Sequence, residues 1–252
     1  MSDARSPARR RRKPSPVRKL RPFWFLLVLV LALGAIGAYL LVTWPALYPH
    51  TIEVSGNRVV ARASVEDAAH INLTQNMWLQ NTRAMRERIE AIPYVDRAQV
   101  HRRPPDTIAI SVTERVPYAV VRGAGGIATI DDTLRVLQAG AALASLPVFD
   151  EPAIALPAPG KWIQSNAVDT LARVATHATQ AHLDSEELSY DKFGDIVLRL
   201  RSGVTVQLGD GSDLDKKLAM VEPILTQVQH GSRRIASIDL RAITTPVVVY
   251  AK

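Results

Sequence analysis

The sequence predicts an α+β protein with a single transmembrane helix, then a small α+β domain, then a β-rich domain with two flanking helices. Three observations predict this architecture. A basic N-terminal tail runs into one long uncharged apolar stretch, short strand patterns dominate the rest of the chain, and two amphipathic helical patterns lie among the later strands. With 252 residues, 47% of them hydrophobic, the chain can bury substantial cores.

The stretch Phe23–Val42 predicts the transmembrane helix, because about 20 consecutive apolar residues are needed to cross a hydrocarbon core about 30 Å thick. Trp24 at one end, and Trp44 and Tyr48 at the other, occupy positions that amphipathic rings favour at membrane surfaces, and the basic flank holds the N-terminus in the cytoplasm. We therefore expect a basic cytoplasmic tail at 1–22, a transmembrane helix at 23–44 and an extracytoplasmic remainder.

Two other interpretations of the apolar stretch are a cleaved signal peptide and a buried helix of a soluble protein. The stretch is longer than the apolar region of an ordinary signal peptide, and no small-residue cleavage site followed by polar sequence stands out after it. Both interpretations are therefore less favoured than an uncleaved anchor.

The positive charge is concentrated in the tail. Nine Arg and Lys residues but only one acid, Asp3, precede Phe23, so subtracting this +8 from the net charge of +7 leaves −1 for the remainder. The remainder has no overall charge that would attract a nucleic acid. A DNA-binding role for the tail itself stays open as an alternative to its role in setting topology.

The first extracytoplasmic segment, residues 49–117, predicts a small α+β domain. Its Gly56-Asn57 pair suits a turn that requires positive φ. In chain order we expect a strand at 51–54, a turn at 55–57, a second strand at 59–61, a helix capped by Ser64, a helix from Asn81 or Thr82 to Ile92 that ends before Pro93, and a hairpin of strands at 95–101 and 108–113.

The second segment, residues 118–252, predicts the β-rich domain. We expect strands at 118–121, 127–130, 135–137, 188–191, 196–201, 204–208, 235–240 and 247–250. A proline-rich stretch at 149–160 is interpreted as a loop. Helices are expected at 166–181 and from a cap at Ser212 to Gly231, the second interrupted by Pro223.

The chain carries no recognisable catalytic, metal or cofactor motif. It lacks cysteine, its six histidines are scattered, and neither a nucleophile elbow nor a phosphate-binding loop is present. Two acidic clusters, Asp131-Asp132 and Asp210 with Asp213 and Asp215, suit either calcium binding or, with fewer assumptions, turns and helix caps. We therefore expect no enzymatic activity, no cofactor, no metal and no small-molecule substrate.

Two ordered blocks of residues resemble the FtsQ/DivIB family of bacterial cell-division proteins, whose members have a basic tail, an anchor helix, a POTRA domain and a β domain. The POTRA block comprises Gln75-Asn76 followed by Met77-Trp78-Leu79, Ile92-Pro93-Tyr94-Val95, Ala98-Gln99-Val100, Arg102 or Arg103, Pro105, Ile108-Ala109-Ile110 and Val112-Thr113-Glu114-Arg115-Val116-Pro117. The β-domain block comprises Leu208-Gly209-Asp210, Lys217-Leu218 and Ser237-Ile238-Asp239-Leu240-Arg241. We interpret Gln75, Asn76, Pro93, Val112, Glu114, Arg115 and Pro117 as structural, with Glu114 and Arg115 as an exposed ion pair.

The resemblance implies a non-enzymatic scaffold of the divisome at the division septum. Its extracytoplasmic domains would bind other division proteins, of the FtsB and FtsL type, and help control septal peptidoglycan synthesis. Periodicity alone leaves open whether the final strand is an ordinary covered strand or a free sheet edge. The resemblance favours an edge to which a partner strand is added, and Pro246, which lacks an N–H, fits an edge. The predicted partner-binding residues are Pro246, Val247, Val248, Val249, Tyr250 and Ala251, together with Arg241.

Two rival functions are a POTRA-bearing factor for polypeptide transport or assembly, and an anchored cell-wall hydrolase. The first would need a downstream barrel of many amphipathic strands, and the second a convergent catalytic constellation. The sequence offers neither, so we favour the division scaffold.

Overall fold

The computed structural model describes residues 17–140, 143–229 and 234–251. Residues 1–16 of the predicted basic tail lie outside these described residues, as does Gly231, where the last helix was expected to end. The chain divides into two compact units. One comprises the residues up to 53 with 72–80 and 102–108, and the other comprises 54–71, 81–101 and the residues from 109 onward.

The first unit contains the predicted membrane helix. Helix α1 (Val17–Thr43) begins six residues before the predicted start, and the short 3-10 helix η1 (Pro45–Leu47) follows it. Its window Phe23–Leu40 has a mean hydropathy of 2.4 and is not buried against any described residue. The helix is therefore long and apolar enough to cross a membrane, which suggests that it anchors the chain.

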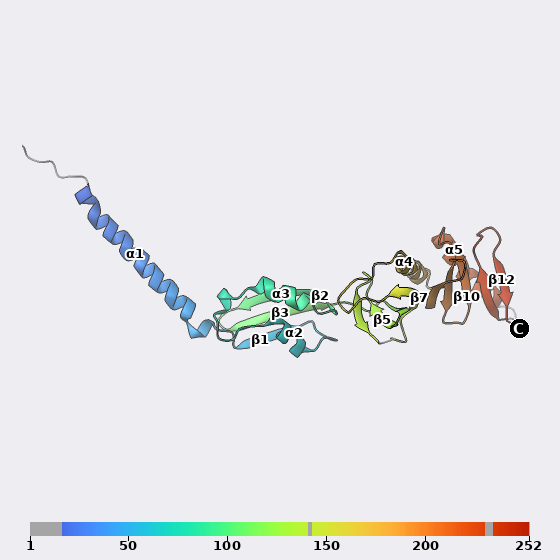
Figure 1. Ribbon diagram of the computed structural model, residues 1–252, viewed down its shortest axis with the longest axis horizontal. Helices are drawn as coiled ribbons and strands as arrows, with labels where there is room; N and C mark the ends of the chain where they lie inside the picture. The colour runs from blue at the N-terminus through green and yellow to red at the C-terminus, as the bar shows by residue number, and fades with distance from the viewer. Residues whose placement is uncertain (1–16, 141–142, 230–233, 252) are drawn as a thin grey trace, which may run out of the picture. The chain divides into compact units, whose positions relative to one another are not determined.

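A three-stranded sheet forms the first fold after α1, in the strand order β1-β3-β2 (Figure 1). Its elements are β1 (Thr51–Ser55), α2 (Arg62–Ala69), η2 (Met77–Leu79), α3 (Thr82–Glu90), β2 (Val95–Arg103) and β3 (Thr107–Glu114). Asn81 caps α3 by accepting a hydrogen bond from the Ala84 N–H at 3.1 Å. The predicted second helix and the predicted hairpin are confirmed, the helix ending two residues early.

Two local predictions in this fold are wrong. Residues 59–61 do not form a strand, and Ser64 lies inside α2, whose N-cap is Ala61. The predicted turn at Gly56 is confirmed, with φ +84°, and a Cβ there would overlap the carbonyl oxygen of Val112. Only glycine fits this position, because the backbone of β3 passes directly beneath it.

A nine-stranded sheet forms the second fold, in the order β12-β11-β10-β9-β8-β7-β4-β5-β6. The strands are β4 (Ala119–Ala124), β5 (Gly126–Ile130), β6 (Val136–Ala139), β7 (Val148–Ala155), β8 (Ser185–Tyr190), β9 (Ile196–Leu200), β10 (Thr205–Gly209), β11 (Ile235–Asp239) and β12 (Val247–Tyr250). Helices α4 (Asn166–Gln180) and α5 (Leu214–Gln229) pack against each other, α4 over β7 and β8 and α5 over β10 and β11 (Figure 1).

The core of this fold lies between the sheet and the two helices. Its largest side chain is Phe149, which is fully buried and meets the Tyr118 ring edge-on at 6.2 Å. The Tyr118 hydroxyl donates to the carbonyl of Ala172 at 2.9 Å, and the Tyr190 hydroxyl donates to that of Ala167 at 3.0 Å. Tyr118 and Tyr190 therefore hydrogen-bond to the backbone of α4 while their rings pack in the core.

Two predictions in the second fold are also wrong. The proline-rich stretch 149–160 is not a loop throughout, because β7 extends to Ala155 and pairs in parallel with both β4 and β8. Pro152 is tolerated because it lies beyond the last pairing with β8 and within the irregularity of the pairing with β4. Ser212 does not cap α5, since its N–H donates to the Asp210 carboxylate and the helix begins at Leu214.

Candidate partner-binding site

The last strand, β12, occupies one edge of the nine-stranded sheet. It pairs antiparallel with β11, and Val247 lies opposite Asp239. The Ala251 N–H extends this ladder by donating to the Arg234 carbonyl at 2.8 Å. Among the described residues, no strand pairs with the outer side of β12. The sheet therefore ends on a short strand that another strand could extend.

The side chains of β12 are unusually apolar for an edge strand. Val247, Val249 and Tyr250 are 54%, 50% and 40% exposed, whereas Val248 is half-buried. Pro246, which is also exposed, immediately precedes the strand. Edge strands usually carry charged side chains that oppose pairing with another chain, and β12 has none.

Arg241 lies in the connection between β11 and β12. Its guanidinium donates to the Asp239 carboxylate at 2.7 Å from Nη2 and at 3.1 Å from Nε. These hydrogen bonds lower the pKa of Asp239 against the opposing effect of its burial. Arg241 is thus held beside the last residue of β11, close to the end of β12 where Val247 pairs.

Gln75 and Asn76 precede η2 and differ in burial. Gln75 is exposed and its carbonyl accepts from the Gln80 side chain at 3.0 Å, whereas Asn76 is 2% exposed. The Asn76 Oδ1 accepts from the Trp78 N–H at 2.9 Å, and its Nδ2 donates to the Val42 carbonyl at 3.0 Å. Asn76 therefore shapes η2 and ties it to the last turn of α1.

Glu114, at the end of β3, binds backbone rather than its neighbour Arg115. Its carboxylate accepts from the N–H groups of Arg58, Val59 and Val60 at 2.8–3.1 Å. Burial acts to raise the Glu114 pKa, but the three backbone hydrogen bonds outweigh it and the pKa is lowered. The predicted exposed ion pair of Glu114 with Arg115 is therefore wrong, because each side chain has partners distant in sequence.

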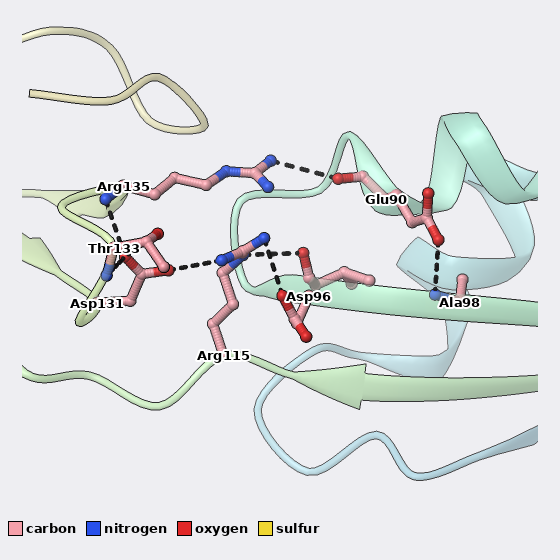
Figure 2. A network of polar contacts seen from close by, with 8 residues as sticks. Glu90, Asp96, Ala98, Arg115, Asp131, Thr133 and Arg135 are labelled. Carbon is pink, nitrogen blue, oxygen red and sulfur yellow. Dashed lines mark hydrogen bonds and ion pairs between the residues drawn. The ribbon is translucent and has the colours of Figure 1, made fainter.

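Arg115 joins the three-stranded sheet to the nine-stranded sheet (Figure 2). Its guanidinium lies 2.7 Å from the Asp131 carboxylate and 3.0 Å from that of Asp96, and it donates to the Val95 carbonyl at 3.2 Å. The side chains of Arg115 and Asp131 are only 12% and 1% exposed. A buried, hydrogen-bonded ion pair of this kind strongly disfavours loss of either partner.

Asp131 is also the centre of the turn that follows β5, which confirms the predicted turn at Asp131-Asp132. Its Oδ1 accepts from the N–H groups of Thr133 and Arg135 at 2.9 and 2.8 Å (Figure 2). The Arg135 guanidinium donates to the Glu90 carbonyl at 3.2 Å and stacks over the Trp162 ring at 5.1 Å. Burial, and then the charge of Arg115, lower the Arg135 pKa, while Asp131 and Asp96 oppose them.

The remaining motif residues have packing roles. Pro93 is half-buried in the turn between α3 and β2, and Val112 is buried in β3. Pro117 is half-buried in the four-residue connection from β3 to β4. The predicted partner-binding residues around β12 therefore do not come together with the POTRA-motif residues around Arg115. The two sets lie at opposite ends of the nine-stranded sheet.

Sequence reasoning missed Asp96 and Asp131 as partners of Arg115, and Arg135 as a donor to the Glu90 carbonyl. Their only sequence signal is an unpaired charge next to a predicted strand end, a pattern shared by many solvent-exposed residues. Within the described residues, no group of three or more His, Asp or Glu side chains is arranged to hold a metal ion.

Comparison with known proteins matches both folds. Residues 49–115 match the model of the FtsQ-type POTRA domain, and residues 119–241 match that of the C-terminal domain of cell division protein FtsQ/DivIB. The chain belongs to the FtsQ/DivIB family. It is therefore a bacterial cell-division protein, and Glu114 and Arg115 are the last two residues of the POTRA match.

Relatives extend this match over most of the chain. The cell division protein FtsQ of Streptomyces collinus is 28% identical over 239 residues, covering 92% of this chain and 89% of its own. FtsQ of Neisseria meningitidis is 22% identical over 222 residues, covering 86% and 88%. The solved extracytoplasmic domain of DivIB from Geobacillus stearothermophilus aligns with 47% of this chain and 98% of its own at 14% identity, with a TM-score of 0.30, too low to support a structural argument.

Proposed function

We propose that this FtsQ/DivIB protein is a non-enzymatic scaffold with its N-terminus in the cytoplasm and its POTRA domain (49–117) and β domain (118–252) outside the cytoplasmic membrane. There, at the division septum, it binds other division proteins of the FtsB and FtsL type and helps control septal peptidoglycan synthesis. The basic tail and the apolar helix α1 support this topology. Family membership favours division over transport or cell-wall hydrolysis.

The edge strand β12 is the single observation that carries the binding proposal. A partner strand pairs with its outer backbone, while Val247 and Val249, each about half exposed, contact apolar side chains of the partner. Because β11 is the one strand that pairs with β12 among the described residues, pairing of β12 with a partner strand continues the same sheet. Arg241, kept in place by Asp239, adds a charge at one end of this surface.

Deletion of residues 247–252 tests the binding proposal. The probe is a purified complex of the extracytoplasmic parts of the FtsB- and FtsL-type proteins from the same organism, and circular dichroism establishes that the shortened protein still folds. We expect binding to be lost. Undiminished binding by a folded deletion variant would contradict the use of β12.

A fluorescent fusion of the full chain tests the cellular role independently of β12. We expect the fusion to concentrate at midcell in dividing cells. An even distribution around the envelope throughout growth would argue against the septal location, whatever the binding measurements show.

A further inference from the structure

The segment 72–80, here called the Trp78 loop, exposes three large apolar side chains next to the end of α1. Leu73, Trp78 and Leu79 are 53%, 53% and 54% exposed. Between and beside them, Met77 and Asn76 are buried. Because buried residues lie between the exposed ones, the loop is folded against the rest of the protein and the three apolar side chains point outward from it.

Hydrogen bonds within the loop hold it in this shape. The Gln80 side chain accepts from the Asn72 N–H at 3.1 Å and donates to the carbonyls of Asn72 and Gln75 at 2.7 and 3.0 Å. Gln80 is 6% exposed, so these bonds are shielded from water. The apolar side chains of Leu73 and Leu79 are therefore fixed at the two ends of a rigid loop.

The contact between Asn76 and Val42 sets the depth of the loop in relation to a membrane. The apolar window of α1 ends at Leu40, and its 18 residues span about 27 Å at about 1.5 Å per residue. Val42 follows two residues later, at the boundary between the hydrocarbon and the lipid headgroups. Because the Asn76 side chain donates to the Val42 carbonyl, the loop lies at headgroup depth when α1 spans the bilayer.

Arg102 adds the polar component expected of such a position. Its guanidinium lies over the Trp78 ring at 5.5 Å and donates to the carbonyls of Met77 and Gln80 at 2.8 and 2.6 Å. An indole fixed by a cation combines an apolar ring with a group that attracts lipid phosphates, and tryptophan is enriched at this depth.

We propose that the Trp78 loop inserts Leu73, Trp78 and Leu79 into the headgroup layer of the outer face of the cytoplasmic membrane. The lipid surface is the partner that the structure favours, because Asn76 joins the loop to the helix that enters that surface. The loop then gives the protein a second attachment to the membrane and restricts rotation of the chain about the end of α1. This inference rests on the proposed membrane topology.

Single cysteines test the proposal, because the chain contains none of its own. Leu79→Cys and Leu73→Cys place a fluorescent nitrobenzoxadiazole label at the loop. Phe193→Cys, at a 73% exposed position of the β domain, is the matched control, and Trp44→Cys reports insertion of the anchor. The full-length variants are reconstituted in phosphatidylethanolamine and phosphatidylglycerol vesicles whose acyl chains are brominated near the headgroup.

We expect the labels at positions 73 and 79 to be quenched about as strongly as the label at position 44 and several-fold more strongly than the label at position 193. Quenching at 44 with none at 73 and 79 would overturn the loop proposal while leaving the topology intact, and would point to a protein partner for the loop. Absence of quenching at position 44 would overturn both. Circular dichroism of each labelled variant verifies the fold.

Discussion

The two ends of the nine-stranded sheet differ in how their backbone and side chains are used. At the β6 end, charged and polar groups bind the POTRA fold: Arg115 pairs with Asp131, Arg135 donates to the Glu90 carbonyl, and the Tyr94 hydroxyl donates to Gln138 at 3.1 Å. At the β12 end, the strand presents exposed valines, and among the described residues no strand pairs with its outer side.

This difference shows how one sheet can serve two kinds of attachment. Buried ion pairs with many hydrogen bonds tolerate little change in geometry, so the β6 end suits a permanent connection within the chain. An apolar edge strand pairs through repeating backbone groups and can bind and release a partner, so the β12 end suits association between chains. Four predictions test this division of roles, beginning with the largest expected effect.

Replacement of Asp131 by Ala is expected to destabilise the protein most. It leaves Arg115 partly buried without its closest carboxylate and removes the acceptor of the Thr133 and Arg135 N–H groups, so the free energy of unfolding should fall by ~3–5 kcal/mol. Urea denaturation of the part of the chain that follows α1 measures this loss. The matched control is Asp132→Ala at the exposed neighbouring position, where a change within ~0.5 kcal/mol is expected. Equal effects at both positions would contradict a special role for Asp131.

Replacement of Val249 by Lys is expected to act on binding instead of stability. A charge on the exposed face of β12 opposes strand addition, so affinity for the FtsB- and FtsL-type complex should fall by about 2 kcal/mol, roughly 30-fold. Ala139→Lys places the same charge at an exposed position of the opposite edge strand, β6, and should leave affinity unchanged. The comparison between the two edges fails if both substitutions weaken binding equally. Surface plasmon resonance measures both affinities.

Replacement of Glu114 by Gln is expected to reduce stability by about 1.5 kcal/mol near neutral pH, because hydrogen bonds to a charged acceptor are weakened. The folded-state pKa of Glu114 is lowered, so its contribution is present above the unfolded pKa and is lost as pH falls through the folded pKa. The gap between wild type and variant should therefore close in acid, as followed by denaturation at a series of pH values. A gap that is constant with pH would refute the role of the carboxylate charge.

Replacement of Trp162 by Leu is expected to have the smallest effect. It removes the stacking with Arg135 but leaves the hydrogen bond to Glu90, so the loss should be ~0.5–1 kcal/mol. Phe193→Leu is the control, since Phe193 stacks with Lys192 at a 73% exposed position where a smaller change is expected. Thermal denaturation compares the two. A loss at Trp162 as large as that of Asp131→Ala would contradict the dominant role given to the Arg115–Asp131 ion pair at the β6 end.

The sequence by itself determined the features that depend on neighbouring residues. The apolar run of α1, the cap of α3 at Asn81, the hairpin of β2 and β3 and the position of β12 near the C-terminus all follow from local periodicity and turn residues. The blocks of family residues also include Glu114 and Arg115, although they did not reveal the partners of these side chains.

Only the tertiary structure decided the features that depend on residues far apart in the chain. Residues 59 and 60 resemble a strand, yet their N–H groups bind the Glu114 carboxylate 54 to 55 residues away. Residues 149–155 begin a stretch that resembles a loop, yet parallel pairing with β4, and with β8 as far as Asp150, makes them part of a strand. Backbone groups must find a partner once buried, and that partner is supplied by the fold, so local pattern cannot specify which distant residue it is.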